Sequence, residues 1–115
     1  MSLSDAARGY LNDILESIAR VERYVAGLNE ASFTADDLRS DAAIRNLEII
    51  GEAARGLSKI DITSADKIEW SEAWAMRNVL THGYRGVELG IVWDTIVKDL
   101  PRLRTAVMNL LNATP

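Results

Sequence analysis

The chain contains no cysteine and a single histidine among its 115 residues. Without cysteine it forms no disulfide scaffold, thiolate zinc site, iron–sulfur centre or cysteine nucleophile. One histidine cannot supply the two or three imidazoles that most catalytic zinc or di-iron sites require. We therefore expect no metal and no other cofactor.

Long apolar runs and a surplus of basic residues are also missing. No segment approaches the roughly 18 uninterrupted apolar residues of a membrane helix. The first residues lack the basic and apolar regions of a signal peptide, so we expect a cytoplasmic protein without a membrane partner. Thirteen basic residues against seventeen acidic ones give a formal charge of −4. At first sight this charge argues against a nucleic-acid partner, because phosphate binding depends on Lys and Arg.

Few residues interrupt the chain, which has two prolines, seven glycines and no linker-like or repeated segment. Its length and its 48% content of apolar residues predict a single globular domain over residues 1–115. A chain of this length builds only a thin hydrophobic core, so added stabilisation by a partner subunit would be unsurprising.

Apolar residues recur at steps of three and four along most of the chain, which predicts amphipathic helices. The first helix is expected from about Ala6 to Leu28, with Gly27 and Asn29 allowing a turn. Thr34 is the candidate N-cap of the second helix. The first stripe comprises Leu11, Ile14, Leu15, Ile18, Val21, Val25 and Leu28; the second comprises Leu38, Ala43, Leu47, Ile50, Ala54 and Leu57, widened by Ile44 and Ile49.

Two further helices complete the predicted fold. The third is expected from Ala65 to about His82, with Gly83 ending it. Pro101 should kink or restart the fourth helix, because proline removes a backbone hydrogen bond. The fourth stripe comprises Leu89, Val92, Trp93, Ile96, Leu100, Leu103, Val107 and Leu110. The sequence therefore predicts an all-α, up-and-down four-helix bundle with a proline-kinked last helix.

Polar groups suited to phosphate chemistry gather at the end of the third predicted helix. No acidic residue stands between Glu72 and Glu88, whereas this window contains Arg77, Arg85 and His82. Arginine offers a planar fork of donors to phosphate oxygens, and histidine exchanges a proton near neutral pH. A base and a cation suffice to cleave RNA without metal, leaving a cyclic phosphate, and such chemistry could not act on DNA.

Other interpretations of this window remain open at this point. Asn78, four residues before His82, could fix the imidazole tautomer or hold a phosphate. Tyr84 could stack on a base, bind a phosphate or be modified. An Arg and a His near a helix end also act as caps that complement the helix dipole. A non-catalytic module that binds a nucleotide or RNA is a further alternative.

The run Arg77-Asn78-Val79-Leu80-Thr81-His82-Gly83-Tyr84 resembles the Arg-(four residues)-His-any-Tyr motif of the HepT-like ribonuclease toxins, a branch of the HEPN superfamily. The similarity extends over nearly the whole chain. It includes residues 10–15, residues 44–53, and the segments Val92-Trp93 and 99–103. Family members often show Pro-Trp before the third helix, where this chain has Glu69-Trp70.

The resemblance implies a homodimer with a shared cleft and a metal-independent endoribonuclease toxin of a type VII-like toxin–antitoxin system. By position, Arg77 and His82 would be catalytic, and Asn78 and Arg85 would support phosphate binding. Tyr84 would be the site where an MNT-type nucleotidyltransferase antitoxin transfers AMP to silence the enzyme. RNA is then the expected substrate.

A second polar group lies on the second predicted helix. Glu48 and Glu52 stand four residues apart, between Arg45 and Arg55. Paired carboxylates can bind a metal or share a proton, but charges in this alternation more often form exposed ion pairs. We expect ion pairs here.

Overall fold

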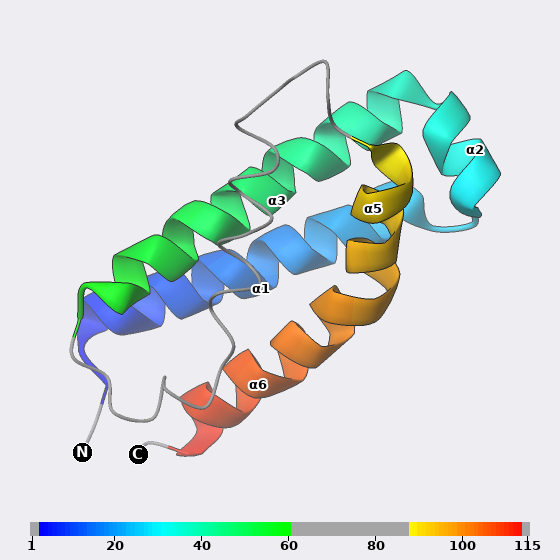
Figure 1. The fold of residues 1–115 in the computed structure, drawn as a ribbon. Helices are drawn as coiled ribbons and strands as arrows, with labels where there is room; N and C mark the ends of the chain where they lie inside the picture. The colour runs from blue at the N-terminus through cyan, green and yellow to red at the C-terminus, as the bar shows by residue number, and fades with distance from the viewer. Residues whose placement is uncertain (1–2, 61–87, 114–115) are drawn as a thin grey trace.

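The computed structural model describes residues 3–60 and 88–113. Throughout these two ranges the regular elements are helices, and neither range contains a strand. In chain order they are α1 (Asp5–Val25), α2 (Glu30–Ala35), α3 (Asp37–Ser58), α5 (Leu89–Asp94), η2 (Thr95–Asp99) and α6 (Leu100–Ala113). The predicted all-α fold class is confirmed (Figure 1). The third predicted helix falls within residues 61–87, outside the described part of the chain.

Helix α1 begins and ends close to the predicted positions. The Ser4 side chain caps it by accepting a hydrogen bond from the Ala7 amide at 3.1 Å. After the helix ends at Val25, Gly27 adopts a φ of 80°, the left-handed region that glycine enters at little cost. The predicted stripe is confirmed: Leu11, Ile14, Ile18 and Val21 are fully buried, and Leu15, Val25 and Leu28 are partly buried against the core.

The predicted N-cap of the second helix is wrong. Thr34 lies inside α2, a short helix that the apolar periodicity did not predict, and its hydroxyl donates to the Glu30 carbonyl. Asn29 and Ser32 form a capping box that starts α2. Asp36 ends α2 and caps α3, accepting from the Arg39 amide at 3.0 Å. Phe33 in this short helix is completely buried, so α2 contributes to the core.

Helix α3 presents most of its predicted stripe to the core. Its first member is an exception, because the Leu38 side chain is 81% exposed in the first turn. The others pack inward: Ala43, Leu47, Ile50, Ala54 and Leu57 are buried, and Ile44 and Ile49 are half-buried. The apolar period therefore starts one turn later than the sequence indicated.

Helices α1 and α3 form the principal packed pair and run antiparallel (Figure 1). At one end of the pair the Tyr10 ring lies directly against Gly56, where an added Cβ would clash with the ring. At the other end of the pair, the Arg39 guanidinium donates to the Tyr24 carbonyl at 3.1 Å. The two helices are thus held at both ends.

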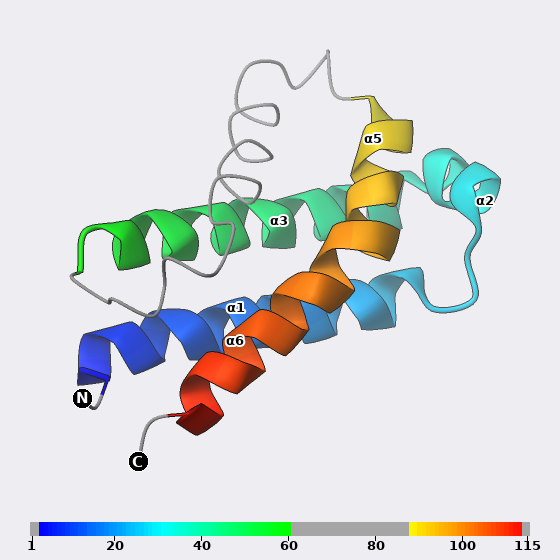
Figure 2. The same cartoon turned by 60° about the horizontal axis from the view of Figure 1, so that its bottom comes forward.

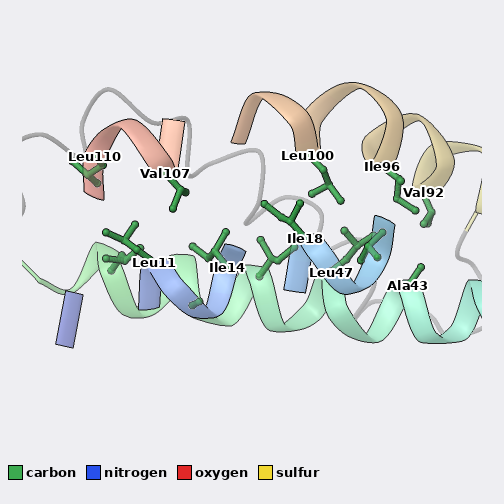
Figure 3. Packing of buried hydrophobic residues seen from close by; sticks show 14 of the residues in the cluster. Leu11, Ile14, Ile18, Ala43, Leu47, Val92, Ile96, Leu100, Val107 and Leu110 are labelled. Carbon is green, nitrogen blue, oxygen red and sulfur yellow. The ribbon is translucent and has the colours of Figure 1, made fainter. Parts of the chain in front are cut away.

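The last three elements follow one another without interruption (Figure 2). Helix α6 packs against α1, and α5 packs against α2. Arg104 of α6 also pairs with Glu22 of α1. The predicted stripe again faces the core: Figure 3 shows Val92, Ile96, Leu100, Val107 and Leu110, which are buried. Leu89, Trp93 and Leu103 are partly buried against the same core.

A π-helical turn separates α5 from α6. The Leu100 amide donates to the Thr95 carbonyl, five residues back, instead of four as in an α-helix. This turn ends at Asp99, two residues before Pro101. A residue inserted into the helical ladder is one of the recognised ways a helix changes direction. The kink at Pro101 itself stays a prediction.

Within the described ranges, no helix combines the length and the apolar character needed to cross a membrane.

Candidate active site

All five predicted site residues fall in one segment of the chain. Arg77, Asn78, His82, Tyr84 and Arg85 lie within residues 61–87, outside the described residues. What the structure describes is the framework on both sides of them. The described chain stops two residues after α3, whose C-terminal end lies beside the start of α1, and resumes one residue before α5, which lies near α2 (Figure 1). The two flanks of the motif are therefore held at opposite ends of the α1–α3 pair.

The flank after the motif is anchored by aromatic packing. Helix α5 starts after Glu88, whose carbonyl accepts from the amides of Ile91 and Val92. In the same helix, the centroid of the Trp93 ring lies 5.2 Å from the centroid of the Phe33 ring, and the two ring planes are tilted by 43°. Tilted pairs at this separation suit the aromatic quadrupoles. Since Phe33 is fully buried in α2, the chain leaving the motif is tied directly to the core.

The flank before the motif is the C-terminal end of α3. The amides of Lys59 and Ile60 donate to the carbonyls of Gly56 and Leu57, which closes the last turn. Ile60 packs against the core, and Leu57 beneath it is buried. The described chain is thus packed against the core on both sides of residues 61–87, by Ile60 before them and by Trp93 after them.

Sequence reasoning missed a buried polar residue in the middle of α3. Asn46 is 5% exposed, and its side-chain amide nitrogen donates to the Ala42 carbonyl at 2.9 Å. In the described part of the chain its Oδ1 is buried without a hydrogen-bond partner. The sequence signal that could have revealed its burial is its position: Asn46 lies three residues after Ala43 and one before Leu47, inside the apolar face of α3.

The predicted ion pairs of α3 are wrong. Among residues 3–60 and 88–113, no ion pair joins Glu48 or Glu52 to Arg45 or Arg55. Spacing alone would allow pairs between Arg45 and Glu48 and between Glu52 and Arg55, which stand three residues apart, but Glu48 and Glu52, four apart, carry like charges that repel. The described residues also contain no group of three potential metal ligands. Nothing in the geometry assigns these carboxylates a catalytic role.

Comparison with known proteins identifies the family. Residues 14–110 match the family model described as Ribonuclease HepT-like. The chain belongs to the HepT-like ribonuclease family. The predicted resemblance to the HepT-like family is therefore confirmed, as is the all-α, HEPN-like fold class; the roles of Arg77, His82 and Tyr84 stay predictions. The prediction of a ribonuclease is confirmed at the level of the family.

Individual HepT-like relatives cover the chain almost completely. A protein of Caldanaerobacter subterraneus subsp. tengcongensis, named as a candidate RNase, is 38% identical over 104 residues, which make up 90% of this chain and 93% of the relative. A protein of Thermococcus cleftensis named "Probable ribonuclease HepT" is 35% identical over 97 residues, 84% of this chain and 88% of the relative.

A third relative is longer than this chain. In Methanocaldococcus jannaschii, a protein whose name joins gamma-glutamylcyclotransferase to a candidate RNase is 38% identical over 102 residues. These residues cover 89% of this chain but 46% of that protein, so the chain spans about half of it. No solved structure matches the chain at a comparable level.

Proposed function

We propose that this protein cleaves RNA as the metal-independent endoribonuclease toxin of a type VII-like toxin–antitoxin system. The observation that carries the proposal is the order Arg77-(four residues)-His82-Gly83-Tyr84 in a chain that matches the HepT-like family over residues 14–110. The names of the relatives support RNA as the substrate. Residues 1–115 act as one domain in this proposal, and the protein works in the cytoplasm.

The chemistry needs a base, an acid and a cation. His82 takes the proton from a ribose 2′-OH, and the 2′ oxygen attacks the adjacent phosphorus. The bond from phosphorus to the 5′ oxygen of the next nucleotide breaks, and that oxygen receives the proton from the imidazolium. Arg77 stabilises the negative charge that develops on the phosphate oxygens. The products are a 2′,3′-cyclic phosphate and a 5′-hydroxyl, and DNA is excluded because it lacks the 2′-OH.

Asn78 and Arg85 support this chemistry by holding the phosphate. Arg85 adds a second permanent charge to the acid-free window between Glu72 and Glu88. Asn78 offers both a donor and an acceptor, so it can bond to a phosphate oxygen or to the imidazole. Neither residue exchanges a proton with the substrate.

A homodimer completes the site. On a regular helix Arg77 and His82, five residues apart, point about 140° away from each other. A second copy of the motif placed opposite brings an arginine and a histidine to one phosphate without distorting either helix. The thin core of a 115-residue chain is a further reason to expect association.

Control of the toxin acts through Tyr84. An MNT-type nucleotidyltransferase antitoxin transfers AMP to the phenol oxygen of Tyr84, two residues from His82. The added nucleotide occupies the cleft, and its phosphate repels the RNA backbone. Mass spectrometry after co-expression with such a nucleotidyltransferase should find one added AMP that is absent from Tyr84→Phe. An unmodified wild-type tyrosine contradicts this part of the proposal.

Cleavage of RNA in the presence of EDTA tests the catalytic assignment. Wild-type protein should cleave, and Arg77→Ala and His82→Ala should each lose activity. Arg20→Ala is the matched control, because Arg20 pairs with Glu16 within α1 and removing it also deletes one positive charge. Cleavage that survives both motif substitutions would reject the assignment. Saturable RNA binding without a product would favour the non-catalytic binding module instead.

A further inference from the structure

The last helix carries no charged side chain after Arg104. Residues 105–115 are the longest stretch of the chain without an acidic or basic residue, although 26% of all residues are charged. The exposed positions of the other two long described helices do carry charges, such as Glu16 on α1 and Asp41 on α3. An uncharged exposed face therefore distinguishes α6 from α1 and α3.

A stripe of exposed residues runs along this face. The α6 stripe comprises Pro101, Thr105, Met108 and Asn112. Its members follow one another at steps of four, three and four, the spacing that keeps side chains on one side of a helix. All four are exposed. Val107 and Leu110, which are buried in the core, lie on the opposite side of α6.

The charged residues that flank the α6 stripe are already paired. Arg104 pairs with Glu22 of α1, on the side where α6 packs against that helix (Figure 2). Arg102 pairs with Asp99 at 2.7 Å, within the same continuous helical run. The positive charge of each arginine is thus balanced locally, and the stripe between them offers only apolar and uncharged polar groups.

The chemistry of the α6 stripe fits a second copy of itself. In a two-fold symmetric dimer the same patch lies on both sides of the interface, so the patch has to be self-complementary. The Asn112 amide and the Thr105 hydroxyl each contain a donor and an acceptor, so either group can pair with a group of its own kind. Met108 and Pro101 add apolar surface, and methionine is enriched in protein interfaces.

The net charge of the protein also favours a second copy as the occupant. Each copy has a formal charge of −4, so two copies repel each other when their acidic surfaces approach. Contact through an uncharged face keeps the acidic residues of α1 and α3 out of the interface. A basic partner, in contrast, would bind where acidic side chains are exposed, because complementary charges guide association.

We propose that the α6 stripe is the surface through which two copies of this protein associate, with α6 of one copy packed against α6 of the other. The inference rests on the proposed function, in which a homodimer completes the catalytic site. It assigns the contact between the copies to the last helix. Met108, 45% exposed in a single copy, lies within the stripe and becomes buried when the copies meet.

Charge substitutions at Met108 test the proposal by analytical ultracentrifugation. Wild-type protein should sediment as a dimer. Met108→Arg and Met108→Glu should each raise the dissociation constant of the dimer by on the order of 100-fold, because like charges then face each other across the interface. An equimolar mixture of the two variants should associate again, since opposite charges now meet. A monomeric wild type, a Met108→Arg that dimerises like wild type, or a mixture that stays monomeric overturns the proposal.

Leu38→Arg is the matched control. It also places an arginine at an exposed apolar position of a helix, since Leu38 is 81% exposed on α3. This variant should dimerise like wild type. If it weakens the dimer as much as Met108→Arg does, the effect does not belong to the α6 stripe and the proposal is overturned.

Thr105→Arg serves if a Met108 variant fails to fold, which circular dichroism would show. Arginine favours a helix more than threonine does, and position 105 is exposed. Thr105→Arg should also weaken the dimer, and association equal to that of wild type overturns the proposal.

Association is measured without RNA, so this experiment separates a failure of the inference from a failure of the proposed function. If Met108→Arg breaks the dimer but wild-type protein cleaves no RNA, the ribonuclease proposal is wrong and the interface stands. If wild-type protein cleaves RNA but Met108→Arg dimerises normally, the ribonuclease proposal stands and the inference about α6 fails.

Discussion

The ring centroids of Phe33 and Trp93 lie 5.2 Å apart and join α2 to α5, two elements far apart in the sequence. Phe33 is fully buried, whereas Trp93 is partly buried against the same core. This contact fixes the point at which the chain leaves residues 61–87. It also makes the short helix α2 part of the fold and not merely a connection.

Phe33→Ala should therefore destabilise the protein severely. Removing a fully buried phenylalanine deletes its apolar contacts and leaves a cavity, at a cost of about 3–5 kcal/mol in the free energy of unfolding. Urea unfolding followed by circular dichroism measures the change. Leu38→Ala is the control, since Leu38 is 81% exposed and its loss should change stability by less than about 0.5 kcal/mol. Equal losses for the two variants would contradict the described packing.

Gly56→Ala should also destabilise, for a steric reason. A Cβ at position 56 would stand 2.6 Å from Cε1 of Tyr10, closer than real Cβ atoms approach a ring. Forcing the ring or the helices apart costs about 1–3 kcal/mol. Gly9→Ala is the matched control, because nothing lies within 4 Å of its Cβ position and alanine favours the helix by up to about 1 kcal/mol. Thermal unfolding should thus move in opposite directions for the two substitutions; a gain in stability for Gly56→Ala would refute the contact.

The corrected helix boundary gives a third prediction. Asp36→Ala should cost about 1 kcal/mol, because its carboxylate accepts from the Arg39 amide and caps α3. Thr34→Ala should have a small effect, within about 0.5 kcal/mol, since the Thr34 hydroxyl only bonds back to Glu30 inside α2. Chemical unfolding of the two variants measures the loss in the free energy of unfolding that each substitution causes. A larger loss for Thr34→Ala would restore the boundary that the sequence predicted.

Much of the fold could be predicted because helical burial follows a period that the sequence displays. Leu11, Ile18 and Val107 were each placed on the correct face by spacing alone. Leu38 was misplaced because the period does not show where a helix starts. That start depends on Asp36 and on the capping box of Asn29, which are local polar contacts.

The candidate site was less predictable from spacing. Arg77 and His82 stood out through their chemistry in an acid-free window and through their resemblance to the family motif. The match over residues 14–110 shows the family, and the roles of these two residues stay a prediction. Asn46 did not stand out, because burial of a single polar residue inside an apolar stripe depends on the packing of several helices. The predicted ion pairs at Glu48 and Glu52 failed for a related reason. Opposite charges near one another on a helix need not pair when both are solvated.

The ends of the RNA products test the central claim most directly. An oligoribonucleotide should be cut by the purified protein in EDTA to give a 2′,3′-cyclic phosphate and a 5′-hydroxyl, both identified by mass spectrometry. The same oligonucleotide with a single 2′-deoxyribose at the cleaved position should stay intact there, because His82 would have no hydroxyl to deprotonate. Products with a 3′-hydroxyl and a 5′-phosphate, or cleavage at the deoxy position, would contradict the account.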